Sequence, residues 1–310
     1  MHQPADGLAS LIAIATLAVM KLKLLMLLCV LTASVQAGQP ISPLSSQSTF
    51  KPSKIMVIGH RGAAGSAPEN TLAAIKEALK QGVDAIEVDL HQSADGVVVA
   101  IHDDTVDRTT DGKGKVADLT IEQLKELDAG GWFDAKFAGE QIPTLEEVLR
   151  AVPDKTVLIL EVKEGSETYP GIERRIIDGV RQAERTNVIL KSFSIEVLKT
   201  FERIAPDYVR LYVFNAHIPF LNLIVDDWLR FGNAFDQNVS WLQKHSSFIT
   251  DGFVRRAQER KIQVVAWNVH DPAMMREMID LRVDAIETDY PAVLKRMLAK
   301  AVKAPAEAVR

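Results

Sequence analysis

Two histidines and two neighbouring carboxylates could carry chemistry in the first third of this sequence. His60 and His102 flank the stretch that contains Glu87 and Asp89. These two acids are two residues apart, so on a β-strand their side chains face the same way. Buried carboxylates side by side repel each other unless a cation or hydrogen-bond donors compensate them. The pattern therefore predicts metal-assisted acid–base chemistry.

Only four residues, 93–96, separate the acidic stretch from the next β-rich run at 97–101. A parallel crossover needs about a dozen residues or more, so we expect an antiparallel hairpin. If the turn contains two residues, Glu87 lies opposite His102, whereas another loop length would shift this register. The hairpin then places His102 beside the carboxylates.

Several short motifs, in a fixed order, resemble those of the glycerophosphodiester phosphodiesterase family. They are His60-Arg61-Gly62, Pro68-Glu69-Asn70-Thr71, Glu87-x-Asp89, His102-Asp103-Asp104-Thr105, Asp107-Arg108-Thr109-Thr110, Glu161-x-Lys163, Lys191-Ser192-Phe193-Ser194, Trp267-Asn268-Val269 and Thr288-Asp289-Tyr290-Pro291. The resemblance extends from residue 55 to residue 298. It implies a barrel fold and hydrolysis of glycerophosphodiesters to sn-glycerol 3-phosphate and an alcohol, after attack by the glycerol's own hydroxyl or by water.

A second acidic position lies at the end of another apolar run. Glu161 and Lys163 are again two residues apart, where the carboxyl end of a barrel strand would carry active-site groups. The resemblance makes Glu161 the third metal carboxylate beside Glu87 and Asp89, and makes Lys163 a stabiliser of phosphate charge. The alternative is a simple ion pair at the strand end. Three oxygen ligands suit a hard cation, either Mg²⁺ or Ca²⁺.

The two histidines are suited to proton transfer because imidazole titrates near neutral pH. One of His60 and His102 can take a proton from the nucleophile while the other donates one to the departing alkoxide, and the sequence does not distinguish these roles. Arg61 could bind a phosphodiester oxygen bidentately, or form a buried ion pair with Glu69.

Two aromatic residues, Phe193 and Trp267, follow apolar runs and are predicted to bind substrate. Each could form a wall against the apolar or glycerol part of the substrate, or could belong to the core. Glu287, just before the last motif, stands where this family usually has an apolar residue. The pattern assigns no role to this additional acid.

The regular alternation of β and α patterns favours a TIM (β/α)8 barrel over an open doubly wound sheet. We expect eight barrel strands near residues 55–59, 84–92, 156–162, 187–192, 208–213, 234–238, 262–267 and 285–288. The strand at 234–238 depends mainly on the need for an eighth strand. Residues 103–143 do not fit the alternation, so we expect a small insertion at the barrel mouth with a short helix at 121–127.

Composition is compatible with one large domain. The chain has 310 residues, of which 47% are hydrophobic, and a formal net charge of −5. A barrel of this size commonly forms a single domain. No basic stripe interleaved with aromatic residues is present, which argues against a nucleic-acid partner. The oligomeric state stays undefined by the sequence.

The N-terminal residues are typical of a targeting segment. A short basic run begins at Met20, an apolar run covers 24–32, and small residues end at Ala37. Translation could start at Met20; the alternative is an unusually long leader or a membrane anchor. We expect export to the periplasm or the exterior, with no membrane span after cleavage. The expected organisation is a signal peptide at 1–37, a flexible lead-in at 38–53, the barrel at 54–300 and a tail at 301–310.

Two other functions are compatible with the same residues. One is a phospholipase C or D activity on intact lipids, for which 214–229 is the candidate apolar surface. The other is a non-catalytic barrel that only binds phosphodiesters. Such a barrel would be expected to have lost a histidine or an acid, and none is missing here.

Overall fold

The computed structural model describes residues 55–214 and 234–307. The predicted signal peptide and lead-in lie outside these ranges, as do residues 215–229 of the apolar stretch proposed for lipid contact. Within the described ranges, none of the helices combines the length and the apolar character that crossing a bilayer would need.

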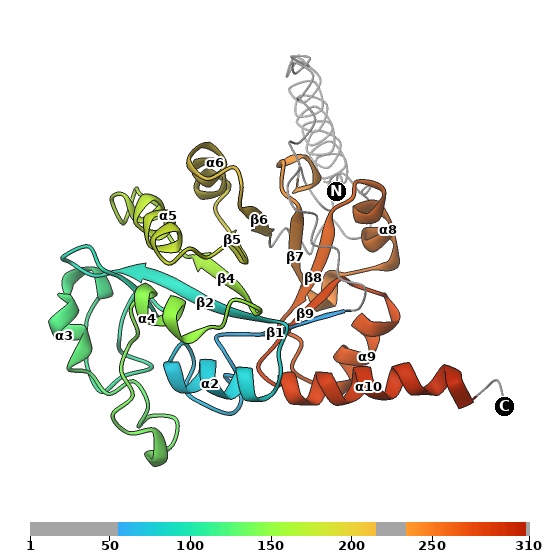
Figure 1. Cartoon of the computed structure of the whole chain (residues 1–310), viewed down its shortest axis with the longest axis horizontal. Helices are drawn as coiled ribbons and strands as arrows, with labels where there is room; N and C mark the ends of the chain where they lie inside the picture. The colour runs from blue at the N-terminus through green and yellow to red at the C-terminus, as the bar shows by residue number, and fades with distance from the viewer. Residues whose placement is uncertain (1–54, 215–233, 308–310) are drawn as a thin grey trace, which may run out of the picture. The chain divides into compact units, whose positions relative to one another are not determined.

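Eight parallel strands form a closed barrel in the described part of the chain (Figure 1). They are β1 (Met56–Gly59), β2 (Ala85–Gln92), β4 (Val157–Val162), β5 (Val188–Ser192), β6 (Val209–Val213), β7 (Trp241–His245), β8 (Gln263–Trp267) and β9 (Ala285–Thr288). The ring closes because β1 pairs in parallel with both β2 and β9. A short strand, β3 (Val98–Ala100), pairs antiparallel with β2. The predicted TIM barrel is therefore confirmed.

Helices follow most strands and lie around the outside of the ring (Figure 1). They are α2 (Leu72–Lys80), α4 (Leu145–Ala151), α5 (Ile172–Gln182), α6 (Ile195–Ile204), α8 (Asp251–Glu259), α9 (Pro272–Asp280) and α10 (Pro291–Glu307). A further helix, α3 (Ile121–Lys125), lies in the segment 103–143. Several of them begin after a side chain that accepts a backbone N–H, as the sequence pattern indicates. Thr71 caps α2, Thr144 caps α4 and Asp271 caps α9.

Alternation along each strand separates two apolar layers. Val57, Ile86 and Val88 face outward and pack with the helices. Ile58 and Ile159 belong to a second cluster, which fills the inside of the barrel. Because the period is two, each inward-facing series continues to the carboxyl end of its strand. Those ends carry the polar residues of the candidate site.

The predicted strand at 234–238 is wrong. Residues Ala234–Asp236 form a short 3-10 helix, and the barrel strand is β7, at Trp241–His245. Asn238 has a left-handed backbone with φ of 48°, which interrupts an extended run. The true strand was hidden because its sequence contains Gln243 and other polar residues that a buried strand seldom has.

The predicted hairpin register is also wrong by one residue. Leu90 pairs with Ala100 and Gln92 with Val98, so Glu87 does not lie opposite His102. The turn has three residues rather than two, and Gly96, with φ of 87°, supplies the left-handed conformation that a three-residue turn requires. β3 ends at Ala100, so the position of His102 is set by contacts after the strand.

Residues 103–143 connect β3 to α4 beside the carboxyl end of β2 (Figure 1). They contain two 3-10 helices, Val116–Asp118 and Ala135–Phe137, and the helix α3. Their apolar side chains form a small cluster of their own that includes Val116 and Leu124. This segment is thus a packed unit that can hold side chains at the mouth of the barrel.

Candidate active site

The predicted acids lie together on the inner face of the barrel. The carboxylates of Glu87, Asp89 and Glu161 are buried, and their oxygens come within 4.8 Å of one another. Lys163 Nζ lies 2.8 Å from Asp89 Oδ1 and 2.5 Å from Glu161 Oε1. Asn70 donates its side-chain N–H to Asp89 Oδ2 at 2.8 Å. Three convergent carboxylates are the donor set of a hard divalent cation, so these residues fit the predicted metal.

The charges of these acids depend on close cations. Burial raises the pKa of Glu87 above its usual value, and the carboxylates of Asp89 and Glu287 add to this effect. Burial would raise the pKa of Asp89 too, but Lys163 and Arg61 hold it well below the usual value. Asp89 is therefore ionised across the neutral range.

His60 follows β1 and is held by an acid from the opposite end of the chain. Its Nδ1 lies 2.7 Å from Asp289 Oδ1, which comes directly after β9. Its Nε2 lies 3.9 Å from Glu287 Oε1. Burial opposes protonation, but the two carboxylates outweigh it and raise the pKa of His60. An imidazole that donates Nδ1–H to a carboxylate keeps Nε2 for proton exchange with a substrate.

His102 is held in the same manner by a different acid. Its Nδ1 lies 2.6 Å from Asp103 Oδ1. Burial lowers the pKa of His102, and Lys163 and Arg61 lower it further, against the opposing effect of Asp89. The two imidazoles therefore have opposite tendencies: His60 retains a proton and His102 loses one.

Arg61 takes the role of an ion-pair partner in this structure. Its Nη1 lies 2.6 Å from Glu69 Oε1, and its Nε lies 3.3 Å from Asp89 Oδ2. Arg108, which the sequence reasoning did not single out, contacts both Glu69 and Asp103 at 2.8 Å. A continuous network thus links Asp103, which holds His102, to Asp89, one of the predicted metal ligands.

The two predicted aromatic residues contact each other beside the site. The rings of Phe193 and Trp267 pack edge to face with centroids 5.9 Å apart. Phe193 is 38% exposed, which excludes the alternative that it belongs to the core. Trp267 is half buried against the inner apolar cluster. Lys163 Nζ lies 6.0 Å from the centre of the Phe193 ring, so this aromatic pair lies within reach of the charged centre.

Lys191 and Asp289, like Arg108, were missed by sequence reasoning. Lys191 and Asp289 both lie within motifs that were recognised, but neither received a role. Lys191 Nζ contacts Glu87, Glu161 and Glu287, which also gives the additional acid Glu287 a partner. Lys191 lies on β5 and Glu287 on β9, and strand periodicity turns both side chains inward, so the alternation could have identified these two residues.

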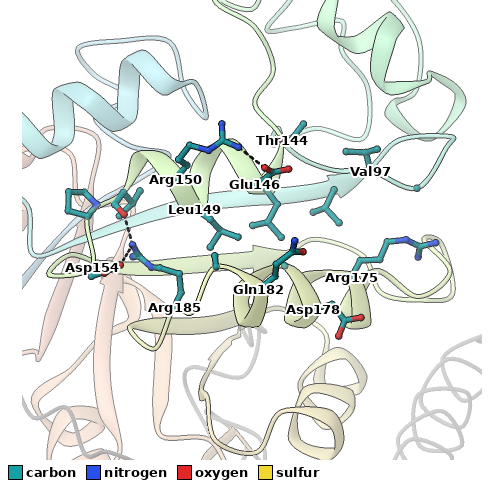
Figure 2. A pocket seen from close by; sticks show the side chains of 17 residues that line it. Val97, Thr144, Glu146, Leu149, Arg150, Asp154, Arg175, Asp178, Gln182 and Arg185 are labelled. Carbon is teal, nitrogen blue, oxygen red and sulfur yellow. Dashed lines mark hydrogen bonds and ion pairs between the residues drawn. The ribbon is translucent and has the colours of Figure 1, made fainter.

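A cleft of about 820 Å³ lies away from these residues, between α4, α5 and the turn of the β2–β3 hairpin (Figure 2). Leu149, Arg150 and Gln182 are among its lining residues. Arg150 is already paired with Glu146 at 2.6 Å. None of the described residues that line this cleft is a predicted site residue, so it is separate from the candidate active site.

The comparisons with known proteins agree with this geometry. Residues 60–293 match the model of the glycerophosphoryl diester phosphodiesterase family. The chain is 37% identical over 249 residues to the glycerophosphodiester phosphodiesterase of Caldanaerobacter subterraneus subsp. tengcongensis. The aligned part covers 80% of this chain and 99% of that relative.

Two solved structures share the fold. The glycerophosphodiester phosphodiesterase of Agrobacterium tumefaciens has a TM-score of 0.65 at 30% identity, covering 77% of this chain and 98% of that one. A phosphodiesterase of Oleispira antarctica, in complex with the product sn-glycerol-3-phosphate, has a TM-score of 0.67 at 29% identity, covering 80% and 97% of the two chains. Because the family model spans most of the barrel and a relative is this similar over nearly its whole length, the chain belongs to the glycerophosphoryl diester phosphodiesterase family.

Proposed function

We propose that this protein hydrolyses glycerophosphodiesters to sn-glycerol 3-phosphate and an alcohol, with a divalent cation and a two-histidine acid–base mechanism. One observation carries the proposal: two histidines, each with Nδ1 held by an aspartate, lie beside three convergent buried carboxylates. Both imidazoles then have Nε2 available for proton transfer, and the acids supply a place for the cation.

Glu87, Asp89 and Glu161 would hold the cation, which when bound supplies positive charge for the phosphoryl oxygens. Lys163 lies at the same place and adds a second positive charge toward a phosphodiester. The pair Phe193 and Trp267 offers an apolar wall for the carbon skeleton of the substrate.

The proton steps follow from the surroundings of each imidazole. His102, which faces the cations Lys163 and Arg61, would accept the proton of the attacking hydroxyl, whether from the glycerol or from water. As the new phosphorus–oxygen bond forms, the bond to the leaving alcohol breaks. Attack by water would give sn-glycerol 3-phosphate directly, whereas attack by the glycerol hydroxyl would give a cyclic glycerol phosphate that a water must then open to sn-glycerol 3-phosphate. His60, which faces Asp289 and Glu287, would give its proton to that departing oxygen.

The experiment that tests this function is incubation of the purified chain with a panel of glycerophosphodiesters, with measurement of released sn-glycerol 3-phosphate. We expect release that stops after chelation and returns when Mg²⁺ or Ca²⁺ is added. Release that is unaffected by chelation would refute the metal dependence. A lack of release from every diester of the panel, under conditions where the cation binds, would refute the activity.

We also propose that the protein is exported, because Met20 to Ala37 combine a basic start, an apolar run and small residues before a cleavage point. Mass spectrometry of the native protein should find a mature chain that begins near Gly38. An intact chain retained in the cytosol would contradict this proposal.

A further inference from the structure

Lys191 is enclosed by carboxylates inside the barrel. Its Nζ lies 3.1 Å from Glu87 Oε1, 2.9 Å from Glu161 Oε2 and 3.1 Å from Glu287 Oε2. The lysine is 2% exposed, and each of these acids is at least as deeply buried. An ammonium group at this depth cannot reach water, so it must remain with an anionic partner.

Two of these three partners are predicted ligands of the divalent cation, and their oxygens are already occupied. Glu87 Oε2 accepts the Arg61 backbone N–H at 3.0 Å, and Glu161 Oε1 contacts Lys163. A cation that binds here must therefore displace ammonium groups from carboxylate oxygens. Lys163 has a partly exposed side chain and can turn toward solvent or a phosphate.

Lys191 has no such exit, and among the described residues its remaining acidic partner is Glu287. Both oxygens of Glu287 lie within hydrogen-bonding distance of Lys191 Nζ, at 3.2 and 3.1 Å. Glu287 projects inward from β9, whereas the predicted ligands lie on β2 and β4. This acid can therefore keep the ammonium when Glu87 and Glu161 turn to a metal.

We propose that Lys191 is an internal cation that neutralises Glu87 and Glu161 in the cation-free protein, and that Glu287 retains this ammonium when a divalent cation binds those two acids. The inference rests on the proposed metal dependence. Glu287 then acts through Lys191 rather than as a metal ligand, and the Lys191–Glu287 pair sets the affinity of the site for its cation.

Substitutions of Glu287 and of Lys191 should change the affinity for the divalent cation in opposite directions. Glu287→Gln removes the retaining charge, so Lys191 competes harder for Glu87 and Glu161 and the Kd for Mg²⁺ or Ca²⁺ should rise on the order of 10-fold. Lys191→Met removes the competitor, so the Kd should fall by a similar factor. The cation-free Lys191→Met protein should melt at a lower temperature, because its carboxylates repel each other, and added cation should recover most of that loss.

The test is a double-mutant cycle, with Mg²⁺ and Ca²⁺ binding measured by calorimetry on the full chain without substrate. In the Lys191→Met background, Glu287→Gln should have much less effect, because no ammonium is left for Glu287 to retain. An equal loss of affinity in both backgrounds would identify Glu287 as a direct ligand and overturn the proposal. Unchanged affinity in Lys191→Met would overturn it as well.

Two further variants serve as a replacement and as a control. Lys191→Gln keeps a polar group and replaces Lys191→Met if that protein does not fold. Lys244→Met removes another buried lysine, one that packs on the rings of Phe214 and Phe253, and should leave the Kd unchanged. If the wild-type chain binds no divalent cation, the metal dependence itself has failed. If the wild-type chain binds the cation, and Glu287→Gln and Lys191→Met each bind it with the wild-type Kd, this inference alone has failed.

Discussion

Each catalytic candidate is an imidazole with its Nδ1 fixed by a carboxylate from a different part of the chain. Asp289 holds His60, and Asp103 holds His102. The surroundings then separate the two: two acids face His60, whereas Lys163 and Arg61 face His102. In the proposed mechanism, burial and these charges together would prepare His60 as the general acid and His102 as the general base.

Asp289 should affect turnover through the orientation of His60. Asp289→Asn keeps the shape but removes the charge that favours the Nδ1–H form, so kcat should fall on the order of 10²-fold or more. Steady-state kinetics on a glycerophosphodiester measures this loss. The pH dependence of turnover should also change: the pKa of the general acid His60 should be lower in the variant, because the carboxylate that raises it is gone. The exposed Asp280→Asn is the matched control, and an equal loss in both would contradict the role.

Glu161 should affect the cation directly. Glu161→Gln retains the side-chain volume but removes one of the three carboxylate charges, so both cation affinity and turnover should fall while the fold is retained. Calorimetry with Mg²⁺ and Ca²⁺ provides the measurement, and the exposed Glu122→Gln in α3 provides the control. Unchanged cation binding in Glu161→Gln would show that this acid is not a ligand.

Strand periodicity explains how much of the site could be predicted at the level of elements. The spacing of Glu87 and Asp89 placed these two acids on one face, and the family resemblance added Glu161 as the third acid. The structure brings all three together. The role of Lys191 was not predicted because this residue lies at the end of an apolar run and was assigned only to a strand. The contact between Asp289 and His60 could not be inferred from local sequence, since it depends on β1 and β9 being neighbours in the closed ring.

The errors at β7 and at the hairpin also have local physical causes. An inward strand with Gln243 lacks the continuous apolar character that identifies a buried strand. A three-residue turn differs from a two-residue turn by a single left-handed position, which the pattern of side chains does not reveal.

Gly96 should therefore be a sensitive position in the hairpin. An alanine there would have to keep the positive φ of 87°, which is unfavourable for a residue with a Cβ, and its Cβ would meet Arg175 Nη2 at 3.2 Å. Gly96→Ala should therefore lower the free energy of unfolding by about 1 kcal/mol. Gly252→Ala is the matched control within α8, where a Cβ meets its nearest atom at 3.9 Å and the change should stabilise by about 0.5 kcal/mol. Chemical denaturation measures both, and equal effects would contradict the assignment of the turn.

At the scale of the whole molecule, charge networks connect the segment 103–143 to the barrel. Arg108 contacts Asp103 on one side and Glu69, from the loop after β1, on the other. Hydrogen bonds from Arg108 and His102 hold the pKa of Asp103 far below its usual value. These contacts fix the segment 103–143 against the loop that follows β1.

The network should make stability depend on acidity in a defined direction. Because the pKa of Asp103 is depressed in the folded state, its contribution is present above the ordinary aspartate value of 3.8 and is lost as the pH falls toward the folded-state value. Asp103→Asn should therefore cost about 1 kcal/mol at pH 7 and progressively less below pH 3.8. Denaturation curves from pH 7 to pH 3 provide the comparison; a cost that does not change with pH would contradict the ionic origin.

In the proposed mechanism, the barrel brings His60 and His102 to the same cation and the same phosphodiester. The most direct measurement is the turnover of His60→Ala and His102→Ala on a glycerophosphodiester and on a substrate with a p-nitrophenol leaving group. Each variant should lose on the order of 10²–10⁴-fold on the natural type of substrate while still binding the cation. The p-nitrophenyl substrate, whose leaving group needs little protonation, should partly rescue His60→Ala and leave His102→Ala impaired. Near-normal turnover of the glycerophosphodiester after either substitution would contradict the two-histidine mechanism.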